Sequence, residues 1–318
     1  MGTDGSSVRP SGASRRTHAG EESASPGAPR IVVMTMVRDE SEMLPRWVDY
    51  YGRELGLGSL IVLDDNSVDG STDDLPCTLY RLPPEPWKQR WAKTRARMVN
   101  GMAGALLACN DVVVFTDVDE FLVADPGKYA GLRDYLAHRS DVPIIAPLAL
   151  EVMHHVGSEP PLDPCRPLLQ QRRYVKFAPG MCKPLVKRVP VPWEPAFHAI
   201  HAPFAVDPDL LLLHLKWSDE PTLSRVAELR HRVREEEGRG SPRSFWAKRP
   251  DQLRRKLASW TSPAGESDPV PVLDVEEVGA RAVVSKRANG TWRPRGNQTT
   301  ALDKTPLRVL PERYRDAF

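Results

Sequence analysis

The feature that most constrains the fold is the alternation of short apolar runs with helix-length amphipathic segments. Residues 31–37 (IVVMTMV) form a continuous run of β-forming apolar residues. Residues 40–55 follow with apolar positions at helical spacing, and Gly56 and Gly58 mark the end of that helix. Residues 60–63 (LIVL) are the next apolar run. A strand, a helix and a strand in this order predict a βαβ unit with parallel strands.

The alternation continues along the chain. Residues 112–115 (VVVF) are a further apolar run of the kind that forms a buried strand. Because helix-length segments separate the apolar runs, we expect an α/β fold with a Rossmann-like, mainly parallel sheet and flanking helices. Ligands of such sheets bind at the carboxyl ends of the strands. The remaining expected strands are 78–82, 144–152, 185–189 and 210–215, and the expected helices are 89–109, 132–138, 222–237 and 244–260.

Composition divides the chain into three regions. Residues 1–29 are rich in Gly, Ser, Ala and Pro and lack the apolar surface that would offset the entropy of ordering, so we expect a disordered leader. Residues 30–220 carry the expected strands and form the sheet domain. Residues 221–318 form a helical and irregular C-terminal extension, in which the signals beyond residue 260 are weak.

Charge and cysteine usage exclude several classes of protein. The net charge is +2 and the basic residues are scattered, so no nucleic-acid partner is expected. No apolar run approaches the roughly 18 residues of a membrane span, and no apolar segment follows the basic N-terminus, so we expect no transmembrane segment and a cytoplasmic location. The cysteines lack metal-ligand spacing, and we interpret them as reduced structural thiols: Cys77, Cys109, Cys165 and Cys182.

Polar residues gather directly after the expected strands, at the edge where a parallel sheet binds ligands. The acidic motif after residues 112–115 contains Asp117 and Asp119. Near an extended backbone two carboxylates at i and i+2 point the same way, and their oxygens suit a hard divalent cation that keeps water and binds a diphosphate. An acidic solvated turn is the alternative for this motif, and an Asx-rich turn that caps a helix is the alternative for residues 64–71.

Three of these strand ends together resemble the glycosyltransferases of the family-two type, whose sheet domain is called GT-A. The matching segments are VRDE (37–40), DDNSVDGS (64–71) and DVDEF (117–121). The DVDEF form is that of a subgroup also similar to family-ninety-two-like enzymes. The resemblance covers about residues 31–230.

The resemblance implies a role for each matching residue. Asp117 and Asp119 would hold Mn²⁺ or Mg²⁺, with Asp119 acting in catalysis through the ion. His214, in the later segment LHLKW (213–217), would be a third metal ligand, and a buried structural histidine is the alternative. Lys183 and His198 would lie on the acceptor or phosphate side; the alternatives are a solvated basic loop for Lys183 and simple loop packing for His198. The nucleotide-sugar contacts would be Arg38, Asp39, Glu40, Asp65, Lys93, Asp117 and Val118.

The predicted reaction is the transfer of a sugar from a nucleoside diphosphate sugar to an acceptor hydroxyl, with inversion. Such a transfer needs a carboxylate that removes the hydroxyl proton, and Glu151 after the apolar run 144–150 is the first candidate, with Glu120 and Asp219 as alternatives. The acceptor class stays open between a glycan, a lipid-linked sugar, a protein and a small natural product. A catalytically silent sugar-nucleotide-binding or partner-binding module is one alternative. A nucleotidyltransferase is another, although residues 38–41 lack its glycine-rich loop.

Overall fold

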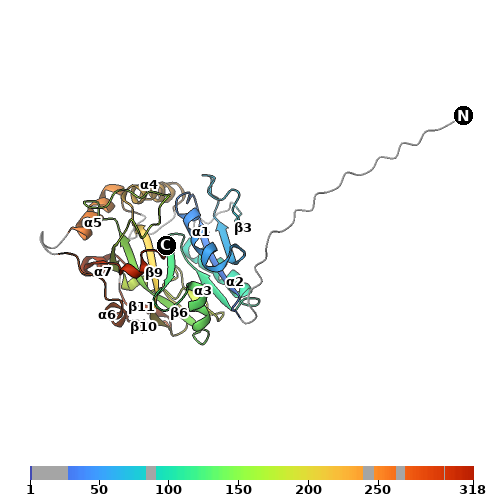
Figure 1. Cartoon of the computed structure of the whole chain (residues 1–318). Helices are drawn as coiled ribbons and strands as arrows, with labels where there is room; N and C mark the ends of the chain where they lie inside the picture. Colours follow the sequence, from blue (N-terminus) through green and yellow to red (C-terminus); the bar gives the residue numbers. More distant parts are fainter. Residues whose placement is uncertain (2–27, 84–90, 239–246, 263–268, 297) are drawn as a thin grey trace.

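The computed structural model describes Met1 and residues 28–83, 91–238, 247–262, 269–296 and 298–318 (Figure 1). The predicted leader therefore lies almost wholly outside the described residues. The part of the chain that is described forms an α/β structure around a ten-stranded mixed sheet.

The first half of the chain builds a parallel sheet in the order β3-β2-β1-β4. Its strands are β1 (Ile31–Val37), β2 (Leu60–Asp64), β3 (Thr78–Arg81) and β4 (Val112–Phe115), and all three neighbouring pairs are parallel. The helices between them are α1 (Met43–Leu55) and α2 (Trp91–Leu106). This half confirms the predicted βαβ pattern, and the α/β, Rossmann-like fold class is confirmed with it.

The alternation of side chains along β1 explains why both faces of the sheet need a helix. Val33 belongs to the core cluster that contains α1, whereas Met34 belongs to the cluster that contains Ala96 and Val99 of α2. Successive side chains of a strand point to opposite faces, so a run that is apolar at every position must be covered on both sides. The continuous IVVMTMV run therefore specifies a central strand.

Residues 120–217 extend the sheet with antiparallel and long strands. β8 (Val186–Lys187) pairs antiparallel with β4, and β6 (Ile144–Met153) pairs with β7 (Tyr174–Phe177), β8 and β9. β9 (Ala205–Trp217) lies between β5 (Glu120–Ala124) and β6. Helix α3 (Leu132–His138) matches its predicted range.

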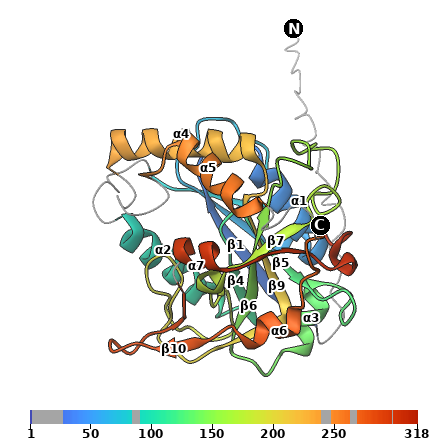
Figure 2. The ribbon, with the colours of Figure 1, turned by 90° about the vertical axis from the view of Figure 1, so that its left-hand side faces the viewer.

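Helices α4 (Glu220–Glu237) and α5 (Pro250–Thr261) follow β9, and α4 lies across one end of the sheet (Figure 2). Asp219 caps α4, because its side chain accepts a hydrogen bond from the Thr222 backbone N–H. Within the described residues no helix has the length and apolar character of a membrane span.

Several elements were not predicted from the sequence because they are too short to show a periodic pattern. Besides β5 and β7, they are α6 (Val275–Ala280), β10 (Val284–Lys286), β11 (Trp292–Pro294), α7 (Gln298–Lys304) and β12 (Leu307–Val309). β12 pairs antiparallel with β7, so the region beyond residue 220 adds a strand to the main sheet. The proposed division at residue 220 stays a prediction, but the residues beyond it share the core of the sheet domain.

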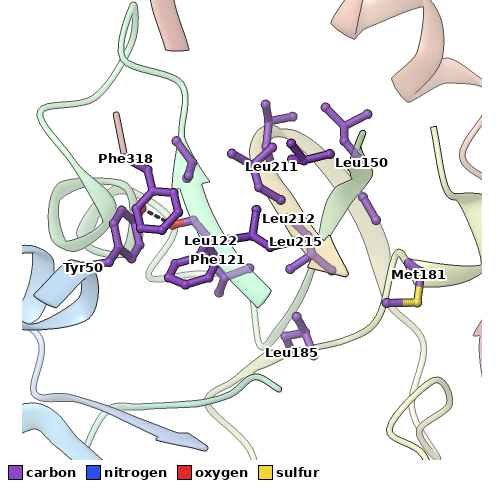
Figure 3. Packing of buried hydrophobic residues seen from close by; sticks show 14 of the residues in the cluster. Tyr50, Phe121, Leu122, Leu150, Met181, Leu185, Leu211, Leu212, Leu215 and Phe318 are labelled. Carbon is purple, nitrogen blue, oxygen red and sulfur yellow. Dashed lines mark hydrogen bonds between the residues drawn. The ribbon is translucent and has the colours of Figure 1, made fainter. Parts of the chain in front are cut away.

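The C-terminal residue is part of that core. The ring of Phe318 lies 5.1 Å from that of Tyr50 in α1 and 4.2 Å from that of Phe121 in β5 (Figure 3). Its backbone oxygen accepts a hydrogen bond from the Leu169 N–H. Arg313, just before it, donates two hydrogen bonds to the carboxylate of Asp125. The end of the chain thus fastens α1 to β5, the strand that follows the acidic motif.

Replacing Phe318 by Ala tests this packing. We expect the free energy of unfolding to fall by about 3–5 kcal/mol, since the change empties a well-packed aromatic site. Val272 is 61% exposed in the same C-terminal region, so Val272→Ala should stay within about 0.5 kcal/mol of wild type. Urea denaturation of the three proteins measures both values, and equal small losses would show that the C-terminus is not part of the core.

Candidate active site

A cleft of about 370 Å³ lies at the carboxyl ends of the parallel strands. The order β8-β4-β1-β2 places the end of β4 in the middle of the cleft floor. Its walls come from the ends of β1, β2, β4 and β9, from α2 and α4, and from the loop after β8. The lining residues are Met36, Val37, Arg38, Glu40, Asp65, Trp91, Arg95, Asp117, Val118, Asp119, Ala196, His198, His214, Lys216, Val226, Leu229, Arg230 and Val233.

The two polar turns after β1 and β2 are tied to each other. The Asp39 N–H donates to the Ser67 hydroxyl at 3.0 Å, and the carboxylate of Asp39 accepts from the Val68 N–H at 2.7 Å. Asp64, buried at the end of β2, accepts from the Ser67 N–H and from Arg81. Asp39 thus holds the turn in place, while Asp65 lines the cleft beside it. Asp64 therefore stabilises the turn, whereas Asp65 lines the cleft. The element that follows residues 64–71 is β3, so the turn caps no helix directly after it.

The acidic motif turns sharply after β4. The Glu120 N–H donates to the Asp117 carbonyl at 3.0 Å, so Asp117 to Glu120 form a tight turn. The extended backbone that we assumed for the two carboxylates is therefore wrong, and their side chains contact different partners. Asp117 contacts Arg95 and Lys183, whereas Asp119 contacts His214.

Two cations hold the carboxylate of Asp117. Arg95 of α2 donates to Oδ1 at 2.5 Å, and the Lys183 ammonium lies 3.4 Å from Oδ2. Burial alone would raise the pKa of Asp117, but these two cations outweigh it and hold that pKa well below its usual range. Asp117 is therefore an anion whose direction is fixed by two partners.

Lys183 also forms an ion pair with a second, fully buried carboxylate, that of Glu120. The side chain of Lys183 is itself only 2% exposed. Burial alone would lower the pKa of Lys183, but the carboxylates of Glu120 and Asp117 raise it. The lysine therefore stays charged and joins the segment before β8 to the turn after β4.

The registers of three neighbouring strands bring His214 between two carboxylates. His214 of β9 is the partner of Glu120 in β5 and of Glu151 in β6. Its Nδ1 lies 2.8 Å from Glu151 Oε2, and its Nε2 lies 3.4 Å from Asp119 Oδ2. Burial alone would lower the pKa of His214, but Glu151 and Asp119 raise it to about 10. Burial alone would raise the pKa of Asp119, but His214 outweighs burial and lowers that pKa to about 2.

Asp119 and His214 have the spacing of two ligands of one ion, which would bind as His214 loses the proton on Nε2. Ligands about 2.1 Å from a metal at angles of about 90–110° lie about 3.0–3.4 Å apart, which matches the Asp119–His214 distance. Glu151 supplies the carboxylate that a metal-binding histidine usually contacts with its other nitrogen. Among the described residues no group of three or more His, Cys, Asp or Glu side chains is arranged to hold a metal. The predicted three-residue set is thus not assembled, since Asp117 is held by Arg95 and Lys183.

Some of the remaining predicted site residues line the cleft and others do not. Arg38, Glu40, Asp65 and Val118 line the cleft, as do the two later histidines, His198 and His214. Burial raises the pKa of Glu40 to about 7 against the opposing charges of Arg230 and Arg225. The candidate bases Glu151, Glu120 and Asp219 do not line the cleft, although all three are described residues.

Lys93 is exposed on α2 outside the cleft, and Arg95 lines the cleft in its place. Helix geometry shows that Lys93 and Arg95 cannot both face the cleft, because residues two apart on a helix face directions about 200° apart. Lys216 and Arg230 also line the cleft and were not predicted. Lys216 follows His214 by two residues on β9, which was a usable signal. Arg230 comes from α4, whose place over the cleft no local pattern shows.

Among the solved structures that match this chain are two of low similarity. A mycobacterial protein shares 16% identity over 41% of this chain, with a TM-score of 0.26, and the match spans 44% of that protein's length. The mannosyltransferase PcManGT from Pyrobaculum calidifontis, solved with GDP-Man and Mn²⁺, shares 16% identity over 80% of this chain and 74% of its own, with a TM-score of 0.34. No protein-family model and no curated protein matches the chain.

The buried ion pair beneath the turn generates a stability prediction. Lys183→Met should lower the free energy of unfolding by about 3–5 kcal/mol, because it leaves Glu120 buried without its cation. The double variant Lys183→Met/Glu120→Gln should recover part of that loss. Lys128→Met breaks an exposed pair with Asp209 and should cost at most about 1 kcal/mol. Denaturant titration ranks the variants, and a Lys183→Met loss no larger than that of Lys128→Met would contradict the role of Lys183.

Proposed function

We propose that this chain is a glycosyltransferase that takes a nucleoside diphosphate sugar as donor and uses Mn²⁺ or Mg²⁺. The observation that carries the proposal is the Asp119–His214 pair, 3.4 Å apart and backed by Glu151, in a cleft that also contains Asp65 and Asp117. The VRDE, DDNSVDGS and DVDEF segments that resemble family-two glycosyltransferases each contribute residues to the lining of this cleft.

The strand order supports a proposed place for each part of the donor. Arg38 and Asp65 lie at the ends of β1 and β2 and are proposed to hold the nucleoside. Asp119 and His214 lie beyond the end of β4 and are proposed to hold the metal. A bound divalent cation supplies Lewis-acid stabilisation of the charge on the leaving diphosphate. Arg95 and Lys183 fix the direction of the Asp117 carboxylate, and they balance its negative charge, which would otherwise repel the donor phosphates.

Glu151 takes a different part from the one first predicted. It is 4% exposed and lies behind His214, so we propose that it orients His214. A carboxylate on one imidazole nitrogen fixes which nitrogen carries the proton and makes the other a better metal ligand. Asp39 likewise acts on the site indirectly, through its hydrogen bonds to Ser67 and Val68.

A panel of nucleoside diphosphate sugars tests the proposal. Purified protein with Mn²⁺ or Mg²⁺ should release nucleoside diphosphate from at least one donor, and EDTA should abolish the release. Asp119→Asn should reduce the rate roughly a thousandfold, about 4 kcal/mol of transition-state stabilisation, and should leave the melting temperature of the metal-free protein within a few degrees. Wild-type turnover that survives exhaustive EDTA would refute the metal-dependent mechanism. Donor binding without turnover would instead favour the silent-module alternative.

The orienting role of Glu151 is tested separately. Glu151→Gln keeps the shape of the side chain and should weaken Mn²⁺ binding about 10- to 100-fold in the presence of a nucleoside diphosphate. Nucleotide binding in EDTA should be unchanged, since Glu151 does not line the cleft. Isothermal titration calorimetry measures both affinities. A variant that binds Mn²⁺ like wild type would show that Glu151 does not act through His214.

A further inference from the structure

Helix α4 forms one wall of the cleft, and the proposed function gives it no role. The helix lies across one end of the sheet (Figure 2). Its residues in the cleft lining are Val226, Leu229, Arg230 and Val233. Three of the four are aliphatic and stand at positions i, i+3 and i+7, so they form one stripe on the helix. This aliphatic stripe, Val226, Leu229 and Val233, runs for about 10 Å at 1.5 Å per residue.

The aliphatic stripe is not the face that packs α4 against the domain. Leu223 and Ala227, each 4% exposed, belong to the main hydrophobic core cluster. None of the three stripe residues belongs to either core cluster of the described residues. With 3.6 residues per turn, the stripe faces a direction about 110° away from Leu223 and Ala227 around the helix axis. The helix therefore has two apolar faces, one that packs against the domain and one that lines the cleft.

Polar contacts near the start of α4 fix the position of the stripe. The capping residue Asp219 also accepts a hydrogen bond of 3.2 Å from Arg172, whose side chain is fully buried. Glu42, directly before α1, accepts from the Thr222 hydroxyl at 2.6 Å and from Arg225 at 2.8 Å. These contacts join the first turns of α4 to the rest of the domain. The stripe is thus positioned before any substrate binds.

A nucleoside diphosphate sugar has little that an aliphatic stripe would bind. Its phosphates and sugar hydroxyls need charged or hydrogen-bonding partners, and its planar base stacks best on aromatic rings. Branched aliphatic side chains instead gain stability when another apolar group removes them from water. The cleft must also hold the acceptor, whose chemical class the proposed function leaves open. An apolar part of the acceptor is therefore the group that matches the stripe.

Resting on the proposed function, we infer that the aliphatic stripe of α4 binds an alkyl chain carried by the acceptor. The acceptor hydroxyl then lies at the metal end of the cleft, beside Asp119, and the chain lies along α4. The acceptor is thus an amphiphilic alcohol, such as a lipid, and not a free glycan. Val226, Leu229 and Val233 are the residues that determine this specificity.

Linear alkanols from butanol to octanol are suitable probes, because each consists only of a hydroxyl and an alkyl chain. Isothermal titration calorimetry measures their affinity for the wild-type protein with Mn²⁺ and with or without a nucleoside diphosphate. We expect the affinity to rise about fourfold with each added CH₂ until the stripe is covered, since each buried CH₂ contributes about 0.8 kcal/mol. Saturating nucleoside diphosphate should not displace the alkanol, because donor and acceptor bind together.

Substitutions at Leu229 test whether the alkanol binds at the stripe. Leu229→Asn places a polar group in the middle of the stripe, and Leu229→Ala is a milder change in case the first variant does not fold. The matched control is Leu57→Asn, since Leu57 is 42% exposed and does not line the cleft. We expect the octanol affinity to fall about tenfold in Leu229→Asn and about threefold in Leu229→Ala. The nucleoside diphosphate affinity should stay within twofold of wild type, and Leu57→Asn should bind both ligands as wild type does.

Three results would overturn the inference. The first is a wild-type affinity that does not increase with chain length, and the second is an unchanged octanol affinity in both Leu229 variants. The third is displacement of octanol by the nucleoside diphosphate, which would assign the stripe to the donor. Failure of the proposed function is a separate result, because wild-type protein would then bind no nucleoside diphosphate, whatever its affinity for alkanols.

Discussion

The arrangement of the cleft depends on the buried ammonium of Lys183. It forms an ion pair with the fully buried Glu120 and contacts Asp117, so one cation balances two carboxylates of the acidic turn. Without it a buried carboxylate would stand uncompensated at the base of the turn, which is among the costliest arrangements in a protein interior. Arg95 completes the balance from α2. The direction of the Asp117 side chain is thus fixed before any substrate arrives.

The same turn separates two chemical roles that the sequence alone had merged. Because the chain reverses between Asp117 and Glu120, Asp117 contacts Arg95 and Lys183, while Asp119 contacts His214. The metal-binding capacity that we propose therefore comes from one acidic residue and one histidine on a distant strand. Glu151 reaches the site through that histidine.

Local sequence patterns predicted the first half of the fold well because its signals are strong. The run 31–37 is buried at every position and matches β1 in full, and the residues of α3 were also predicted without error. β5 was missed because it starts at Glu120, inside the acidic motif, where a buried ion pair replaces the expected apolar signal. The elements beyond residue 262 were not predicted because each is too short to show a helical or strand period in the sequence.

The sequence by itself determined the α/β class, the polar ends of β1, β2 and β4, and the meeting of those ends at one edge. Parallel strands joined by crossovers bring their carboxyl ends together whatever the remaining packing is. Only the tertiary structure decided which side chains meet there. His214, Glu151 and Asp119 come together through the pairing of β9 with β5 and β6. Arg95 replaces Lys93 through the rotation of α2, and Lys183 reaches Glu120 from another segment. Such contacts depend on strand register and helix orientation, which are set by long-range packing that no local pattern records.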